Sequence, residues 1–118
     1  MPNDKHRSDA HLHDMLESAR LIHGYMDGIA FADFWANQEK RDAVALRLSV
    51  LGEAAHKLDK TFEKDLPGVP FKNIRGLRNR IAHDYGAVDF KIVWEVTQKE
   101  IAPLIATLEA YFSEGNRT

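Results

Sequence analysis

The chain contains no cysteine. This absence excludes disulfide bonds, thiolate nucleophiles and cysteine-based zinc sites, and it is compatible with a reducing compartment, so we expect a cytoplasmic protein. Long apolar runs are missing as well, because no segment approaches the roughly 18 apolar residues of a membrane span. The polar start of the chain leads into no signal-peptide core. The sequence therefore predicts neither secretion nor membrane insertion.

Motifs of several enzyme classes are also absent. There is no glycine-rich phosphate loop, no Gly-x-Ser-x-Gly elbow and no carboxylate pair whose spacing indicates acid–base work. These absences argue against kinases, NTPases and serine hydrolases. The six histidines include no His-Glu-x-x-His pair, and His6, His11 and His13 lie in or beside the N-terminal stretch. We therefore expect no metal site and no cofactor.

Charge is unevenly distributed along the chain. Sixteen basic and eighteen acidic side chains give a net charge of −2, so the chain lacks the overall positive field of a typical nucleic-acid binder. Between Asp65 and Asp84, however, there is no acidic residue. The basic residues of that segment are Lys72, Arg75, Arg78 and Arg80. They could hold a phosphate-bearing partner, or they could form a solvated helix face balanced by acids elsewhere in the fold.

Hydrophobic periodicity predicts four substantial helices. The first covers about residues 9–26, and the second opens at Asn37 or Asp42 and runs to about Leu58. The third begins just after Pro70, and the last is capped by Asp89. Short connections favour an all-α fold, an antiparallel up-down four-helix bundle with an additional short helix. We expect one domain over residues 1–118, with a flexible tail of about residues 1–8.

Finer features of these helices are also predicted. An aromatic segment at 31–35 has Asp33 as a possible cap, and residues 59–66 form a short helix or turn. Gly86 is expected as a left-handed residue after the third helix, and Pro103 as at most a local kink in the last. The last helix carries apolar residues on nearly every face, including Phe90, Trp94 and Tyr111. That surplus predicts a dimer interface.

The segment from Arg78 to Tyr85 holds the groups that metal-free phosphodiester cleavage requires. Such chemistry needs a side chain that titrates near neutral pH and a fixed cation for the charge of the transition state. His83 and Arg78 are these two groups. The structural alternative is that the macrodipole favours His83 in the last turn of a helix, and that Tyr85 packs at the helix end.

The pattern Arg78-x-x-x-x-His83-x-Tyr85 resembles the signature of HEPN ribonucleases. It is most similar to HepT-like toxins, which are paired with MNT-type nucleotidyltransferase antitoxins in type II toxin–antitoxin systems. Similar features flank it at residues 51–54 (Leu-Gly-Glu-Ala), 67–71, 74–79 and 93–94. The chain departs from the family at Phe71, where relatives often have tryptophan.

The resemblance implies cleavage of RNA, either mRNA or tRNA, by attack of the ribose 2′-hydroxyl, which leaves a 2′,3′-cyclic phosphate. His83 would act as general base or acid, and Arg78 would bind the scissile phosphate. Asn79 would orient the imidazole or contact RNA. Supporting RNA contacts are expected from Lys72, Arg75 and Arg80. Tyr85 would be the residue to which the antitoxin transfers AMP, and the added group would block RNA.

Helix geometry adds a constraint on this site. At about 100° per residue, Arg78 and His83 lie roughly 140° apart on a continuous helix, while Tyr85 lies about 20° from Arg78. Either the helix distorts near His83, or two copies share the site. A symmetric homodimer would supply separate acid and base histidines, and the family is similar in being dimeric. We therefore expect a homodimer with a composite site.

Two alternative functions stay open at this point. The chain could be a non-catalytic helical-bundle dimer that binds a partner protein or a nucleotide. It could also be a nucleotidyltransferase, but the sequence predicts no strands and no paired-carboxylate metal site, which disfavours that activity. The intact pair of Arg78 and His83 favours the ribonuclease.

Overall fold

The computed structural model describes residues 2–58 and 60–115, with side chains described from residue 9 to residue 114 apart from residue 59. Within these residues the chain is helical and has no strand. The elements are α1 (Pro2–Met26), α2 (Phe31–Ala36), α3 (Gln38–Lys57), α4 (Lys60–Asp65), α5 (Phe71–His83), the 3₁₀ turn η1 (Tyr85–Ala87), α6 (Phe90–Lys99) and α7 (Ile101–Gly115). The predicted fold class, an all-α helical bundle with an additional short helix, is confirmed. All side chains of the predicted tail, residues 1–8, lie outside the described ones, while helix α1 begins at Pro2.

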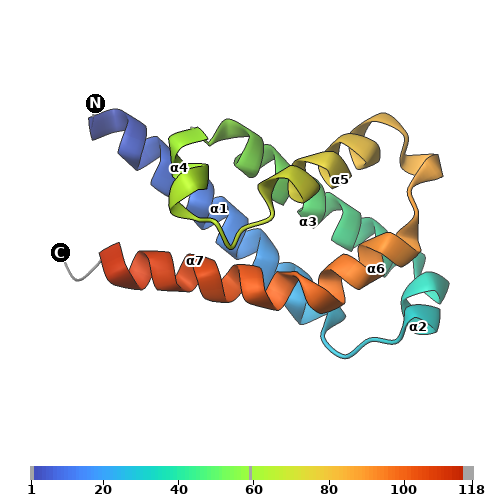
Figure 1. Cartoon of the computed structure of the whole chain (residues 1–118). Helices are drawn as coiled ribbons and strands as arrows, with labels where there is room; N and C mark the ends of the chain where they lie inside the picture. Colours follow the sequence, from blue (N-terminus) through green and yellow to red (C-terminus); the bar gives the residue numbers. More distant parts are fainter. Residues whose placement is uncertain (1, 59, 116–118) are drawn as a thin grey trace.

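Helix α1 is the centre of the molecule. It packs against α3 on one side and against α7 on another, and α5 in turn packs on α3 (Figure 1). The stripe of α1 that faces these helices is mostly apolar, with Leu12, Met15, Ala19 and Ile22 all inaccessible to solvent, and Ser18 is a polar residue buried among them. Residues at this three- and four-residue spacing lie on one side of a helix, which is why α1 can bury them together. Helix α5 is thus an outer helix with a broad exposed face.

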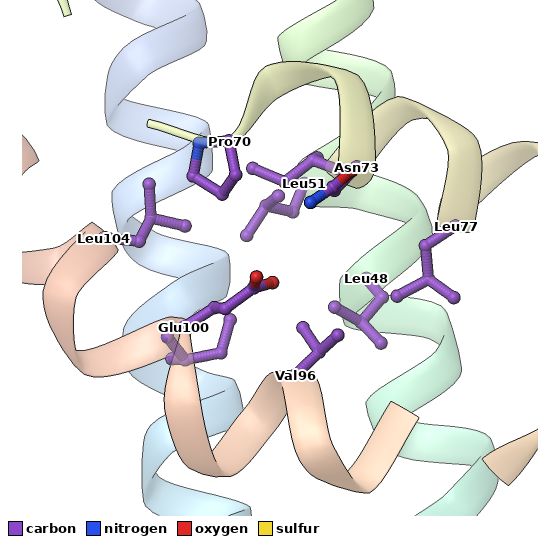
Figure 2. A pocket seen from close by; sticks show the side chains of 10 residues that line it. Leu48, Leu51, Pro70, Asn73, Leu77, Val96, Glu100 and Leu104 are labelled. Carbon is purple, nitrogen blue, oxygen red and sulfur yellow. The ribbon is translucent and has the colours of Figure 1, made fainter. Parts of the chain in front are cut away.

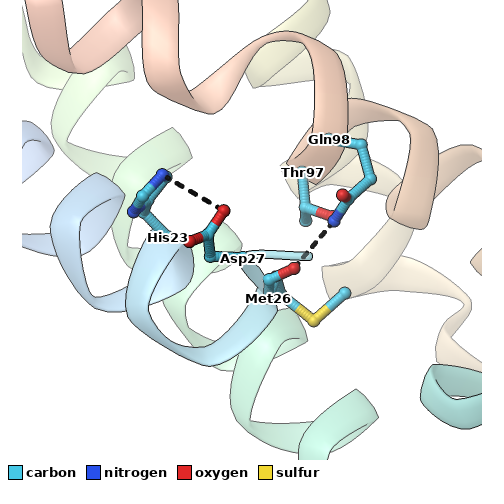
Figure 3. A network of polar contacts seen from close by, with 5 residues as sticks. All are labelled: His23, Met26, Asp27, Thr97 and Gln98. Carbon is cyan, nitrogen blue, oxygen red and sulfur yellow. Dashed lines mark hydrogen bonds and ion pairs between the residues drawn. The ribbon is translucent and has the colours of Figure 1, made fainter. Parts of the chain in front are cut away.

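Polar contacts join the end of α1 to α6. The side-chain amide nitrogen of Gln98 donates to the carbonyl oxygen of Met26 at 2.9 Å (Figure 3), and this carbonyl at the end of α1 also accepts from the backbone N–H of Ile29. Trp94 donates from its indole nitrogen to the carbonyl of Ile29 at 2.8 Å. These two bonds fix α6 against the turn that follows α1, and α6 in turn borders the groove beside α5.

Two of the predicted caps are confirmed. The side chain of Asn37 accepts a hydrogen bond from the backbone N–H of Lys40, and Asp89 accepts one from Lys91. Asn37, and not Asp42, therefore opens α3. The predicted cap at Asp33 is wrong, because α2 begins at Phe31 after Ala30 and Asp33 lies in its first turn.

The predicted last helix is two helices. It ends at Lys99 and starts again at Ile101, with Glu100 at φ −110° and ψ −23° between them. Pro103 has no N–H to donate to the carbonyl of Lys99, so the hydrogen-bond ladder is interrupted there. The prediction of at most a local kink was wrong, because the proline acts one turn before its own position.

The apolar surplus of this region is used within the chain. Phe90 is buried against Phe34, with ring centroids 6.1 Å apart, and Trp94 meets Phe31 at 6.0 Å. Tyr111 donates a hydrogen bond to Asp9 at 2.8 Å. The dimer interface predicted from these aromatics is therefore not supported at these positions. Large exposed apolar side chains occur instead at Trp35 on α2, at Leu46 and Val50 on α3 and at Ile92 on α6.

A small cavity of about 20 Å³ lies beneath the first half of α5. Leucines of α3 line one side, Pro70 and Asn73 line another, and the carboxylate of Glu100 points into it from the junction of α6 and α7 (Figure 2). Helix α5 therefore packs mainly on α3, and side chains of α6 and α7 close the far side of this cavity. No helix among the described residues has both the length and the apolar character needed to cross a membrane.

Candidate active site

Helix α5 carries the predicted site residues other than Tyr85, and local sequence explains where the helix begins and ends. Pro70 precedes its first residue, and the buried side chains of Phe71 and Ile81 hold its two ends against the core. Burying each such side chain stabilises the fold by about 1.5–3 kcal/mol. The helix ends at His83, because Asp84 has φ −155° and ψ 68°. Arg78 and His83 therefore lie on one continuous helix, which is the condition under which an angle of roughly 140° between them was predicted.

Arg78 is held by two partners. Its Nη2 pairs with Oε2 of Glu53 on α3 at 2.5 Å, and its Nη1 donates to Oδ1 of Asn79 at 2.9 Å. The side chain is 28 % exposed, so the remaining guanidinium N–H groups can reach solvent. A guanidinium held in this way is a pre-oriented donor for a phosphate.

Gly52 allows this pairing. A β-carbon placed on Gly52 would lie 2.3 Å from Cβ of Arg78, which no real side chain tolerates. The absence of a side chain at this position lets α5 approach α3 until Arg78 reaches Glu53. The Leu-Gly-Glu-Ala segment quoted in the resemblance thus has a physical role, namely to receive the arginine.

Arg78 lines a cleft of about 380 Å³ between α1, α3 and α5. Other polar residues of the cleft are His11 and Asp14 of α1 and Glu53 and Lys57 of α3. The positive charges of Arg78 and Lys57 face the negative charges of Asp14 and Glu53, so this cleft in one copy of the chain has no net excess of positive charge.

His83 lies elsewhere on the helix. It is exposed, it does not line the cleft of Arg78, and no described residue forms a hydrogen bond or ion pair with it. The imidazole can therefore accept a proton from a bound molecule or donate one to it. A single copy therefore does not bring His83 and Arg78 to one cleft, which is the difficulty that helix geometry predicted.

The other predicted RNA contacts divide between two sides of α5. Lys72 and Arg80 line a groove of about 470 Å³ toward α6, on the side away from Glu53. Arg75 forms an ion pair with Glu63 of α4, and its guanidinium lies 5.9 Å from the ring of Phe71. Arg75 thus ties α4 to α5, and the structure does not place it beside the cleft of Arg78.

Tyr85 lies in the turn after α5, and its hydroxyl donates a hydrogen bond to Asp42 of α3. Partial burial, followed by the hydrogen bond and the negative charge of Asp42, raises the pKa of Tyr85 to about 12, against the opposing charge of Arg41. The side chain is 42 % exposed. Tyr85 is therefore a solvent-exposed residue whose hydroxyl stays neutral across physiological pH.

Two predictions about this turn were wrong for one reason. The angle of about 20° between Tyr85 and Arg78 assumed a helix that continues to Tyr85, but α5 ends at His83. Gly86 was expected in the left-handed region, yet among the described residues only Gly28 has a positive φ. The chain leaves the helix through the extended backbone of Asp84 and a 3₁₀ turn, so no left-handed glycine is required.

The partners of Tyr85 and Arg78 both come from α3. Asp42 and Glu53 are eleven residues apart, which places them about 16 Å apart along the helix and within about 20° of the same face. Leu46 and Val50 lie between them and are 59 % and 36 % exposed. Sequence reasoning did not assign Asp42 or Glu53 to the site, although the Gly-Glu pair at 52–53 was a usable signal.

Comparison with known proteins now decides the family. The model of the family described as "Ribonuclease HepT-like" matches residues 15–111 of this chain. The chain belongs to the HepT-like ribonuclease family. The predicted membership and the predicted enzyme class, a ribonuclease, are both confirmed by this match.

Individual relatives agree with the family match. Two proteins of Methanocaldococcus jannaschii, each named "Putative RNase", are 31% and 35% identical to this chain. The first alignment covers 85% of this chain and 92% of the relative, and the second covers 78% and 76%. A protein of Thermococcus cleftensis named "Probable ribonuclease HepT" is 27% identical over 84% of this chain and 90% of its own length. No solved structure matches.

Proposed function

We propose that this HepT-like protein is the toxin of a type II toxin–antitoxin system and cleaves RNA without a metal ion. The observation that carries the proposal is the arrangement of α5, where Arg78 is pre-oriented by Glu53 and an unpaired imidazole follows at His83. Arg78 would bind the scissile phosphate and stabilise the charge that develops on it. His83 would transfer protons to or from the ribose hydroxyls.

The chemistry balances without a cofactor. The ribose 2′-hydroxyl loses its proton to one imidazole and attacks the phosphorus, the bond to the 5′-oxygen breaks, and that oxygen receives a proton from a second imidazole. The products are a 2′,3′-cyclic phosphate and a free 5′-hydroxyl. Because an acid and a base act in the same step, two histidines serve better than one.

A homodimer would supply the second histidine. The exposed side chains of Leu46 and Val50 form an apolar strip on α3 beside Arg78, and an isologous contact there would bring the two α5 helices together. The site would then contain two arginines and two histidines. Asn79 would keep Arg78 oriented, and Lys72 and Arg80 would hold flanking phosphates, a contribution that weakens with salt. Arg75 is omitted from this group because Glu63 binds its guanidinium.

The regulatory part of the proposal concerns Tyr85. An MNT-type nucleotidyltransferase antitoxin would transfer AMP to its hydroxyl, and the exposure of the residue supports this assignment. The added phosphate and adenosine would stand beside His83, two residues away, and would repel RNA. Intact-mass measurement after co-expression should show whole AMP units on the wild-type chain and none on Tyr85→Phe. An unmodified wild-type chain beside an active transferase would refute this part.

The decisive experiment on catalysis compares cleavage of RNA by the wild-type protein, His83→Ala and Arg78→Ala in the presence of a chelator. We expect cleavage by the wild type, products ending in 2′,3′-cyclic phosphate, and a loss of at least about 100-fold in each variant. Circular dichroism and unfolding curves check that both variants fold. Equal cleavage by all three proteins would favour the alternative, a non-catalytic dimer that binds a partner protein or nucleotide.

A further inference from the structure

A second cavity lies beside the end of α5, between α2, the start of α3 and η1. Its volume is about 180 Å³, and it shares no lining residue with the cleft of Arg78. Its principal side chains are Trp35, Arg41, Asp42, Tyr85 and Phe90. The ribonuclease chemistry described above uses none of them except Tyr85, as a modified residue.

Aromatic rings dominate this cavity, and two of them are open to solvent. Trp35 is 56 % exposed and Tyr85 is 42 % exposed, while Phe90 is buried behind them at ring-centroid distances of 6.4 Å and 5.8 Å. The guanidinium of Arg41 lies over one face of the indole, 4.9 Å from its centre, and donates a hydrogen bond to the backbone carbonyl of Trp35, so its outer side is the surface open to a further ring. Proteins bind unpaired nucleobases by stacking them on aromatic rings and on guanidinium planes.

The rim of the cavity carries hydrogen-bonding groups suited to the edge of a base. Asp42 presents a carboxylate, to which Tyr85 is the only described residue that donates a hydrogen bond, so acceptor capacity remains. The amide of Gln38 is exposed beside it and both donates and accepts. A carboxylate accepts from the exocyclic amino groups of adenine, cytosine and guanine, whereas uracil has none.

The cavity is close to the proposed general acid or base. Tyr85 follows His83 by two residues, so their Cα atoms are at most about 7 Å apart. A base attached to a ribose next to the phosphate at His83 could therefore reach the rings. Trp35 could instead contact a protein, but a hollow with a polar rim fits a flat polar ligand better than it fits a protein surface.

We infer that the cavity of Trp35, Arg41, Asp42 and Tyr85 is a subsite for one unpaired nucleobase of the RNA, with preference for a base that carries an amino group. The inference rests on the proposed function in that the ligand is taken to be RNA. It adds a determinant of which nucleotide lies beside the cleaved bond.

Nuclear magnetic resonance of the indole N–H groups tests the subsite directly. The chain has two tryptophans, and the indole of Trp94 is engaged by the carbonyl of Ile29, so Trp94 serves as an internal control. Titration with AMP, CMP or GMP should shift the Trp35 signal and leave that of Trp94 in place. UMP should shift it less at equal concentration.

A single-stranded DNA oligonucleotide, which lacks the attacking 2′-hydroxyl and is not cleaved, extends the test to a polymer. Trp35→Ala should weaken its binding by about 5- to 150-fold, the range for stacking one base on one aromatic ring, while Trp35→Phe should retain most of the affinity. Unfolding curves of both variants show whether they fold. Asp42→Asn should reduce the preference for amino-bearing bases.

Three results would overturn the inference. The first is a Trp35 chemical shift that none of the nucleotides changes. The second is equal oligonucleotide affinity of the wild type and Trp35→Ala. A third is a Trp35 signal that moves only with protein concentration, which would identify a contact between copies. Failure of the proposed ribonuclease function is separate, because it appears as RNA cleavage that does not depend on His83, whatever the Trp35 signal does.

Discussion

Gly52 and Arg78 face each other so closely that a β-carbon on the glycine would lie 2.3 Å from Cβ of the arginine. Gly52→Ala must therefore push α5 away from α3 or displace Arg78. We expect a loss of about 1–3 kcal/mol in the free energy of unfolding, as for other overpacked sites, together with reduced RNA cleavage. Urea denaturation and an RNA cleavage assay measure the two effects.

Gly76 is the matched control on the same helix. An added β-carbon there has no atom within 4 Å, so Gly76→Ala should be neutral or should stabilise the protein by about 0.5–1 kcal/mol through its higher helix propensity. If Gly52→Ala unfolds at the same urea concentration as Gly76→Ala, the close approach of α3 and α5 is not as described.

Glu53 positions Arg78, and removal of its charge should affect catalysis more than folding. In Glu53→Gln the amide oxygen still accepts a hydrogen bond, but the ion pair is lost, so the guanidinium is held less firmly. We expect kcat for RNA cleavage to fall about tenfold, equivalent to about 1.4 kcal/mol in the transition state, with a smaller change in KM. Glu53→Asp, which keeps the charge on a shorter side chain, should recover part of the loss.

The exposed ion pair of Arg20 and Glu109, at 2.7 Å, offers a control of the same chemical kind. Surface pairs contribute about 0–1 kcal/mol to stability, so Glu109→Gln should leave both unfolding and cleavage nearly unchanged. Equal rates for Glu53→Gln and the wild type would remove Glu53 from the site.

The sequence was informative where a local pattern has one physical solution. Asn37 and Asp89 were recognisable as caps, and Pro70 as the residue before α5, because each acts on its neighbours in the chain. The break at Glu100 was missed because a proline removes a hydrogen bond to a residue one turn earlier. The sequence therefore predicted a disturbance of the helix by Pro103, but it did not predict that the helix would be interrupted.

The candidate site also shows that local patterns identify some residues and miss those brought together by packing. Arg78 and His83 were found from their spacing and from the resemblance, and their angle on α5 followed from helix geometry alone. Glu53 and Asp42 were not assigned, because their roles depend on how α3 packs against α5 and η1, which no local pattern specifies. The turn at Asp84 moved Tyr85 off the helix, and only the folded chain shows its aromatic neighbours.

The exposed strip of Leu46 and Val50 should be the contact that pairs two copies of the chain. Leu46→Asp places a charge at the centre of that strip, which is costly to bury in an interface. We expect a monomer in analytical ultracentrifugation, an unchanged circular dichroism spectrum and loss of RNA cleavage. Ile92→Asp changes a comparably exposed side chain on α6 and should remain dimeric. A dimeric, active Leu46→Asp protein would place the interface elsewhere.

The hydrogen bond between Tyr85 and Asp42 should be visible in the alkaline titration of tyrosine. The pKa of Tyr85 is raised from 10.0 to about 12, chiefly by burial and then by Asp42. A raised pKa means that the fold favours the neutral phenol, so this stabilisation is complete below about pH 10 and is lost as the pH rises through about 12. Asp42→Asn removes the charge and should lower the pKa of Tyr85 toward its ordinary value.

Tyr111 complicates the measurement and also provides its control, because its pKa is likewise raised to about 12, by burial and then by Asp9. The titration of tyrosinate absorbance is therefore best followed in a Tyr111→Phe background, where Asp42→Asn should shift the high-pH step downward. In the Tyr85→Phe background, Asp9→Asn should likewise lower the pKa of Tyr111. If Asp42→Asn leaves the Tyr85 step in place, the hydroxyl does not donate to that carboxylate, and Asp42 loses its proposed place at the rim of the nucleobase subsite.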